Sequence, residues 1–279
     1  MMRFMGAVKC ALLLFSAQIL AAEPIKFGIS PWTSPHLLQA WAKPVEEALE
    51  KQTGVSYQIS SAANLQKYLL AAVEGQYEIL QTPMHLGLYL VRYHNFKPLV
   101  FARAKLKLMV LTRQELSIEG LAQLKGTSMA VSGPLAMATF VAQEAIVNKL
   151  FNVNLVPERN HWKAMEALQK KRMQSAVVGN YLYARLSPPL KSRLKVLYEF
   201  PIELDGLLLV SPGSSPKHLD SITSGLLGFE PHKSSLLTRF EKVTEKELNG
   251  WFDIMNTYVN LVNRYMNEKY FSNESKPSL

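Results

Sequence analysis

The residues with the clearest chemical potential lie in a loop between a predicted strand, 128–131, and a predicted helix, 136–150. A Ser132-Gly133-Pro134 turn joins the two segments. The first amides of a helix have no partner within it, so a strand, a tight turn and a helix start direct several N–H donors at one point. This arrangement predicts a small-anion site. The alternative is an empty loop, because such connections occur throughout α/β domains and many bind nothing.

Two further candidates follow predicted strands. Trp32 lies between two prolines after the strand 25–29, and His85 lies in the first turn of a helix that starts at Pro83. Ligands of α/β proteins gather at the carboxyl ends of strands, so both side chains are expected to line a cleft. A helix N-terminus disfavours positive charge, which favours a neutral, hydrogen-bonding His85. The alternatives are that Trp32 caps the first helix and that His85 is a buried histidine with an internal partner.

Met84 and Met137 stand at the starts of the helices that follow these turns. Methionines at such positions are usually core residues. Near the mouth of a cleft, their polarizable thioethers would make the wall softer and more apolar.

The sequence contains no recognisable catalytic motif. It lacks G-x-S-x-G, H-E-x-x-H, a P-loop and G-x-G-x-x-G. No pair of carboxylates is spaced for acid–base work, and aspartate is scarce, being limited to Asp205, Asp220 and Asp253. The histidines are not spaced as metal ligands on one helix face. We therefore predict a protein that is not an enzyme and holds neither a metal nor a cofactor.

The N-terminal residues 1–22 have the composition of a secretory signal peptide. Arg3 and Lys9 precede an apolar run, 10–20, that is too short to span a bilayer, and Ala21-Ala22 supply small residues for cleavage. The alternative is a buried N-terminal helix. The single cysteine, Cys10, lies in this leader, so the mature chain is expected to have no disulfide and no thiol chemistry.

The charge balance is basic. The formal net charge is +9, and it falls to +7 without residues 1–22, because Arg3 and Lys9 are the only charged residues there. A basic balance favours anionic ligands or surfaces. The basic residues are scattered and no nucleic-acid signature accompanies them, so we expect no nucleic-acid partner.

Short apolar strands alternate with helices, which predicts an α/β fold with mostly parallel sheets. The predicted strands are 25–29, 55–59, 77–80, 98–103, 106–112, 128–131, 153–156, 175–178, 194–200 and 207–210. The longer predicted helices are 36–52, with a kink at Pro44, and 64–74, 83–94, 136–150, 162–171, 181–186, 215–227, 233–240 and 245–267. Two series of this kind suggest two lobes sharing a hinge: lobe I from 23–113 plus 204–271 and lobe II from 114–203, with a disordered tail, 272–279.

Four segments, in this order behind a leader, resemble the type II periplasmic solute-binding proteins. They are 27–31 (FGISP), 77–83 (YEILQTP), 118–126 (IEGLAQLKG) and the pair Asn160-His161. Within that group the chain resembles the phosphate/phosphite/phosphonate-binding, PhnD-like branch of ABC-transporter proteins. The resemblance implies a two-lobed protein that closes on a small ligand in a cleft between the lobes and delivers it to a permease.

The resemblance also implies the site residues. The family's loop after the first turn is rich in Ser and Thr, whereas here the matching stretch, 135–139, keeps only the hydroxyl of Thr139 besides that of Ser132. The family carries an acid after the strand that matches 175–178, where Asn180 stands here. The predicted ligand-binding residues are Trp32, His85, Ser132, Leu135, Ala136, Met137, Thr139, His161 and Asn180.

We expect a monomeric periplasmic protein that captures a small, anionic, phosphate- or phosphonate-like ligand for an ABC permease. The first alternative is a ligand-sensing partner of a membrane sensor kinase, without transport, because an apolar, hydroxyl-poor cleft suits that role as well. The second is an enzyme, since folds of this type have been recruited for catalysis, but the missing acid–base pair counts against it.

Overall fold

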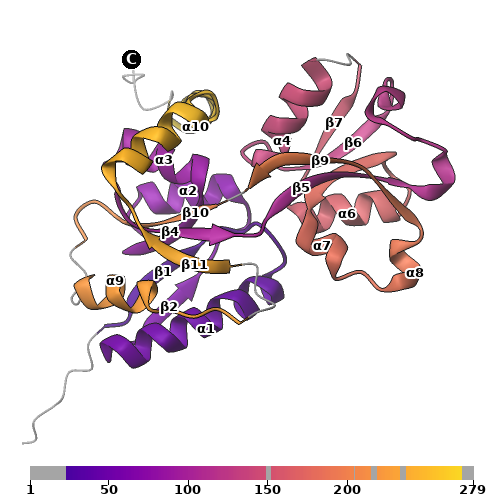
Figure 1. Ribbon diagram of the computed structural model, residues 1–279. Coiled ribbons are helices and arrows are strands. Elements are labelled where there is room, and N and C mark those ends of the chain that lie inside the picture. The colour runs from indigo at the N-terminus through magenta and orange to yellow at the C-terminus, as the bar shows by residue number, and fades with distance from the viewer. Residues whose placement is uncertain (1–22, 149–151, 204, 215–218, 233–236, 272–279) are drawn as a thin grey trace, which may run out of the picture.

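The computed structural model describes residues 23–148, 152–203, 205–214, 219–232 and 237–271. The predicted signal peptide, 1–22, and the predicted tail, 272–279, lie outside these described residues. Figure 1 shows two bodies, each a sheet with helices on both faces, connected by strands that run from one body into the other. The predicted α/β fold with two lobes is confirmed.

The first sheet contains six described strands in the spatial order β11-β4-β10-β3-β1-β2. Their bounds are β1 Ile25–Ile29, β2 Tyr57–Ser60, β3 Ile79–Pro83, β4 Lys97–Ala104, β10 Gly206–Val210 and β11 Leu237–Lys242. The flanking helices are α1 Pro35–Thr53, α2 Leu65–Val73, α3 Met84–His94, α9 Leu219–Leu227 and α10 Glu245–Met266.

The second sheet contains five described strands in the order β7-β6-β8-β5-β9. Their bounds are β5 Lys107–Arg113, β6 Ser128–Ser132, β7 Asn154–Glu158, β8 Ser175–Gly179 and β9 Leu194–Glu203. The helices here are α4 Met137–Ala142, α6 His161–Gln169, α7 Asn180–Ala184 and α8 Pro188–Lys191. Short helical turns of other types span Gln114–Leu116, Leu121–Leu124, Gln143–Val147 and, after α10, Asn267–Phe271.

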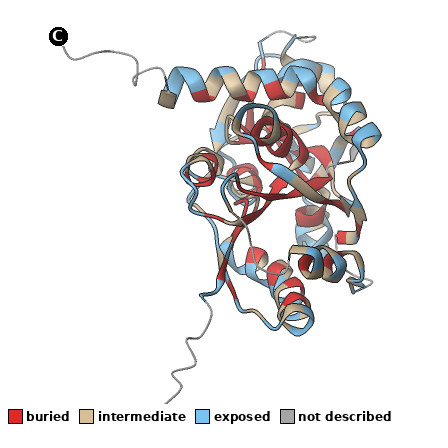
Figure 2. Ribbon diagram, turned by 90° about the vertical axis from the view of Figure 1, so that its left-hand side faces the viewer, coloured by how far each residue is buried: buried red, intermediate tan, exposed pale blue. Residues whose placement is uncertain are grey.

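The apolar residues form three clusters that follow the faces of the sheets. One lies between the first sheet and α1 and α9, and another between the second sheet and α6 and α7. The third packs α2, α3 and α10 on the opposite face of the first sheet and continues to α4 and the second sheet. Figure 2 shows the central strands buried, whereas most helices, with the exception of the buried α3, expose the side that faces away from a sheet. The lobes therefore share apolar contacts as well as chain connections.

The chain crosses between the sheets at two adjacent points. β4 leads into β5, and β9 returns towards β10. β4 pairs with β10 and β5 pairs with β9, both antiparallel, with Ala102 opposite Gly206 and Lys107 opposite Glu203. The two connections therefore run side by side in opposite directions, which is the arrangement expected of a hinge.

The prediction of mostly parallel sheets has to be corrected. β1 pairs in parallel with β2 and β3, and β6 with β7 and β8, but β10 is antiparallel to β3 and β4, β11 is antiparallel to β4, and β5 is antiparallel to β8 and β9. The antiparallel pairs involve the crossing strands and the late strand β11. A buried strand has the same apolar composition in either direction, so its sequence does not reveal the direction of its neighbours.

The predicted helix 233–240 is also wrong in its described part, because 237–242 forms the edge strand β11. β11 pairs with β4, which satisfies its backbone groups and overrides weak local preferences. α1 continues through Pro44 as one helix. The predicted helix 136–150 is α4 followed by a π-type turn at Gln143–Val147. The lobe division stays a prediction; β5, which it assigned to lobe I, pairs within the second sheet.

Candidate functional site

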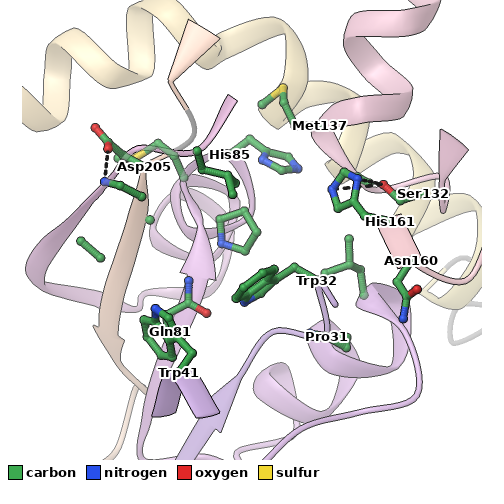
Figure 3. Close-up of a pocket in the computed structure, with 18 of the residues that line it drawn as sticks. Pro31, Trp32, Trp41, Gln81, His85, Ser132, Met137, Asn160, His161 and Asp205 are labelled. Carbon is green, nitrogen blue, oxygen red and sulfur yellow. Dashed lines mark hydrogen bonds between the residues drawn. The ribbon is translucent and has the colours of Figure 1, made fainter. Parts of the chain in front are cut away.

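A cavity of about 110 Å³ lies between the two sheets. Figure 3 shows Ser132, His161 and Met137 on one side of it and Trp41, Gln81 and Asp205 on the other, with Trp32 between them. Its wall is mainly apolar and comes from both lobes. The residues that line it are Pro31, Trp32, Trp41, Leu65, Gln81, Pro83, Met84, His85, Ala102, Ala104, Leu106, Ser132, Ala136, Met137, Arg159, Asn160, His161, Asp205, Gly206, Leu237 and Met255.

The loop that follows β6 supplies backbone donors to the second-sheet side of the cavity. Gly133 turns the chain with a φ of 56°, a left-handed conformation that glycine adopts at little cost. Its amide donates to the Glu158 carbonyl at 2.7 Å, and the Thr139 hydroxyl donates to the Gly133 carbonyl at 2.6 Å. The amides of Met137 and Ala138 begin α4 and have no backbone acceptor among the described residues. The loop is thus held in place with free N–H groups at its end.

Ser132 and His161 form the polar part of this side, and both are buried. The Ser132 Oγ lies 3.3 Å from Nδ1 and 3.4 Å from Nε2 of His161. Contacts of this length to both nitrogens are weak hydrogen bonds, so the hydroxyl is free to turn towards a ligand. Burial lowers the pKa of His161 to about 4, and a hydrogen bond to the Val177 backbone opposes this shift. His161 is therefore uncharged at neutral pH.

His85 faces the cavity from the first turn of α3. Its Nε2 lies 2.9 Å from the Leu135 carbonyl, and since a carbonyl only accepts, Nε2 carries the proton. Burial lowers the pKa of His85 to about 4, against the effect of this hydrogen bond. The neutral ring then has an unprotonated Nδ1, which can accept one hydrogen bond. The prediction was a neutral, hydrogen-bonding His85, and the alternative was a buried histidine with an internal partner. The structure shows both features, because the ring is uncharged and is bonded to the Leu135 carbonyl.

The first-sheet side of the cavity is formed by aromatic rings and one amide. Trp32 packs against the apolar clusters of both lobes, and its ring meets that of Tyr181 edge-on at 5.0 Å. The Gln81 Oε1 accepts a hydrogen bond from the Ser30 hydroxyl at 3.0 Å, which leaves its Nε2 as a neutral donor. A Cβ on residue 206 would lie 3.1 Å from this Nε2, so Gly206 makes room for the amide.

Asp205 is the one acidic residue of the described cavity wall, and both of its oxygens are engaged. Oδ2 accepts from the Arg103 guanidinium at 2.6 Å, and Oδ1 accepts from the Ala104 amide at 3.0 Å. Arg103 in turn pairs with Glu241 at 2.6 Å. Asp205 thus ties the two chain crossings together instead of offering a free carboxylate.

The lobes touch on both sides of the cavity. On one side, the Arg159 Nε donates to the Ala63 carbonyl at 2.8 Å, and the Asn160 amide donates to the Thr33 carbonyl at 3.2 Å. On the other, the Tyr258 hydroxyl donates to Glu144 at 2.5 Å, and the Tyr258 and Phe140 rings stack at 5.8 Å. The cavity is therefore bounded by contacts between residues from distant parts of the chain.

Six of the nine predicted site residues line the cavity, namely Trp32, His85, Ser132, Ala136, Met137 and His161. The other three lie outside its wall. The Leu135 side chain is fully buried in the core, and the Thr139 hydroxyl is turned to the Gly133 carbonyl. The Asn180 Oδ1 accepts from the Lys107 amide at 3.2 Å and its Nδ2 donates to the Lys105 carbonyl at 3.0 Å, so it binds the chain crossing. Ligand contact by any of the nine stays a prediction.

The sequence analysis missed the polar residues Gln81, Arg159, Asn160 and Asp205 of the wall, and the apolar residues Trp41 and Met255. Gln81 ends a strand beside Pro83, and this position could have identified it, as it did His85. Asn160 was noticed only as the neighbour of His161. Asp205 carries no local signal, because its position depends on strand pairing between distant segments.

Among the described residues, no helix combines the length and hydropathy needed to cross a bilayer. The same residues hold no group of three or more His, Cys, Asp or Glu side chains that could bind a metal ion.

A family model described as "ABC transporter, phosphonate, periplasmic substrate-binding protein" matches residues 27–247. No curated protein matches the chain. Among solved structures, PhnD1 from Prochlorococcus marinus in complex with methylphosphonate is similar, with a TM-score of 0.71 and 12% identity over 85% of this chain and 98% of that chain.

Two more solved structures are similar. A binding protein component of an ABC phosphonate transporter from Pseudomonas aeruginosa has a TM-score of 0.66 and 14% identity, over 88% of this chain and 99% of that chain. XAC2383 from Xanthomonas citri, solved bound to ATP, has a TM-score of 0.65 and 11% identity, over 86% and 98%. Identities this low show a shared fold and leave the ligand of this chain open.

Proposed function

We propose that this chain, which belongs to the family of phosphonate ABC-transporter periplasmic substrate-binding proteins, captures a small anion between its lobes, closes on it and delivers it to an ABC permease. It is a binding protein and not an enzyme, like the related proteins. The periplasm is the compartment of this family. Secretion through cleavage of residues 1–22 is part of the proposal.

The start of α4 is the observation that best supports an anionic ligand. The free amides of Met137 and Ala138 belong to the helix start that follows Ser132, and Ser132, Ala136 and Met137 line one end of the cavity. Amide donors at a helix start attract negative charge. The PhnD1 structure contains methylphosphonate, which supports a ligand of this chemistry here.

The loop offers fewer side-chain donors than the family pattern. Leu135, Ala136 and Met137 have no hydroxyl, and the Thr139 hydroxyl is committed to the Gly133 carbonyl. A lost hydrogen bond to a charged group costs about 1.5–3 kcal/mol. We therefore propose that Ser132 and the backbone amides hold the anion.

Closure is proposed to occur about the two adjacent crossings, from β4 to β5 and from β9 to β10. Two short, adjacent segments can absorb a change in backbone angles without disturbing either sheet. The lobes would then comprise 23–104 plus 206–271 and 107–203, following the strand pairing. Asp205 and Asn180 bind these crossings and would set their geometry.

Thermal unfolding of the chain without residues 1–22 tests the proposal, with phosphate, phosphite and methylphosphonate as probes. A ligand at about 100 times its Kd stabilises the fold by about 2.7 kcal/mol, which raises Tm by roughly 5–10 °C. Ser132→Ala should weaken binding at least tenfold, since it removes a donor to charge. Ser192→Ala, on an exposed serine outside the cavity wall, is the matched control. Failure of every anion to raise Tm would refute the proposal.

A further inference from the structure

The cavity has two chemically different ends, as Figure 3 shows. The end near Ser132 and α4 presents hydrogen-bond donors. The opposite end is lined mainly by apolar side chains, including Trp41, Ala102 and Leu237. A ligand anchored by an anionic group at the first end must therefore place the rest of its body against the second.

A cationic group at the second end would lack a partner. Asp205 is the one acid of the described wall, and its oxygens are occupied by Arg103 and the Ala104 amide. The Gln81 Oε1 already accepts from Ser30, and its Nε2 is a donor. Among the remaining side chains of the wall, the uncharged Nδ1 of His85 is an acceptor for an ammonium, and a neutral acceptor does not replace the water that an ammonium loses on burial.

Apolar groups, in contrast, would gain from this surface. Trp32, Trp41, Met84 and Met255 surround the cavity, and methionine adapts its shape to varied apolar partners. The volume of about 110 Å³ must also hold the anionic group, so it limits the body to a short chain, because a cavity of about 150 Å³ holds benzene alone.

We infer that the ligand is a small organic anion whose body is uncharged and apolar, of the short-chain alkylphosphonate class, and not a zwitterion that carries an amine. This inference rests on the proposed anion-binding function and specifies the ligand of the same cavity. The preference for an uncharged body follows from the apolar wall and from the Asp205 carboxylate, whose oxygens are already engaged by Arg103 and the Ala104 amide.

An isosteric pair of probes gives the sharpest test. Propylphosphonate and 2-aminoethylphosphonate differ by a terminal methyl against a terminal ammonium, and titration calorimetry at pH 7.5 measures both Kd values. Propylphosphonate should bind at least tenfold more tightly. From methyl- to ethyl- to propylphosphonate, affinity should rise about fourfold per methylene, equivalent to about 0.8 kcal/mol. Equal or tighter binding of 2-aminoethylphosphonate would overturn the inference.

Two variants test which residues cause the preference for an apolar body over an amine. Trp41→Ala should weaken propylphosphonate at least threefold and leave methylphosphonate within twofold, whereas Trp162→Ala, on an exposed tryptophan outside the wall, should change neither. Asp205→Asn should weaken 2-aminoethylphosphonate no more than propylphosphonate, because the carboxylate does not serve the ligand. A selective loss of 2-aminoethylphosphonate would contradict this. Circular dichroism checks that each variant is folded.

The outcomes separate the inference from the proposed function. If methylphosphonate or phosphate binds and longer alkyl chains bind no better, the inference fails and anion binding stands. If no anion binds, both fail.

Discussion

His85 and His161 stand on opposite sides of the cavity as uncharged side chains. Burial holds the pKa of each at about 4, well below the ordinary value of 6.5. The cavity therefore presents no histidine cation to an anion at neutral pH. We therefore expect that the proposed anion is attracted by backbone amides and the Ser132 hydroxyl, with Arg159 at the exposed rim.

These two histidines should make stability depend on pH. Their folded pKa values are lowered, so the unfolded chain binds more protons between pH 6.5 and about 4, and stability falls as pH falls through this window. Between pH 7.5 and 5.0 each histidine should cost about 2 kcal/mol of unfolding free energy. Urea unfolding at both pH values should show a decline smaller by about that amount in His85→Gln or His161→Gln. If stability declines as much in both variants as in the unchanged protein, these histidines do not cause the pH dependence. His36→Gln, on an exposed histidine, is the control.

At the scale of elements, α10 has a role beyond covering the first sheet. It packs against α3, and its Tyr258 reaches Glu144 of the other lobe. Its start is fixed by a capping box, in which the Thr244 hydroxyl accepts from the Glu247 amide and the Glu247 carboxylate accepts from the Thr244 amide, each at 3.2 Å. The helix is therefore anchored at one end and bridges the lobes near its middle.

Removing this cap should weaken the element. Thr244→Ala deletes the hydroxyl acceptor and should lower the unfolding free energy by about 1 kcal/mol, measured by urea unfolding. The matched control is Thr223→Ala in α9, where the hydroxyl donates to the Leu219 carbonyl within the same helix. Such internal bonds add little to helix stability, so the control should change by less than about 0.5 kcal/mol. Equal losses in the two variants would contradict the role of the cap.

At the scale of the whole molecule, the two lobes are in contact on both sides of the cavity. Tyr258 with Glu144 on one side, and Arg159 and Asn160 on the other, join segments far apart in the sequence. If closure accompanies binding, these contacts contribute to the equilibrium between open and closed forms. A residue outside the cavity wall can then change affinity by changing the closed population.

Tyr258→Phe tests this coupling, because it removes the hydroxyl that reaches Glu144 but keeps the ring that stacks on Phe140. The loss of about 1 kcal/mol should favour the open form roughly fivefold. X-ray scattering should show a larger radius of gyration, and the affinity for methylphosphonate should fall by up to that factor. In Tyr93→Phe the lost bond, to Asn260, lies within one lobe, so neither quantity should change. Identical behaviour of the two variants would exclude a role for the Tyr258 contact in closure.

The sequence by itself determined the alternation of strands and helices, the strand–turn–helix geometry of the loop after β6, and the absence of catalytic motifs. These features depend on residues a few positions apart, where apolar period, turn residues and helix starts act locally. The site was predictable to the same extent: Ser132, Ala136, Met137, Trp32, His85 and His161 follow strand ends or open helices, and the structure brings them to one cavity.

Only the tertiary structure decided which strands run antiparallel, that 237–242 is a strand, and which polar groups remain available to a ligand. Asp205 is sealed by Arg103, 102 residues away in sequence, and Asn180 is drawn to the crossing at Lys105 and Lys107. Such partners are chosen by packing and by the pairing of distant backbone groups, which no local pattern encodes. The sequence therefore predicted a loop for an anion, and the fold determined that the cavity beside this loop is mainly apolar and that its one described acid, Asp205, is engaged by Arg103 and the Ala104 amide.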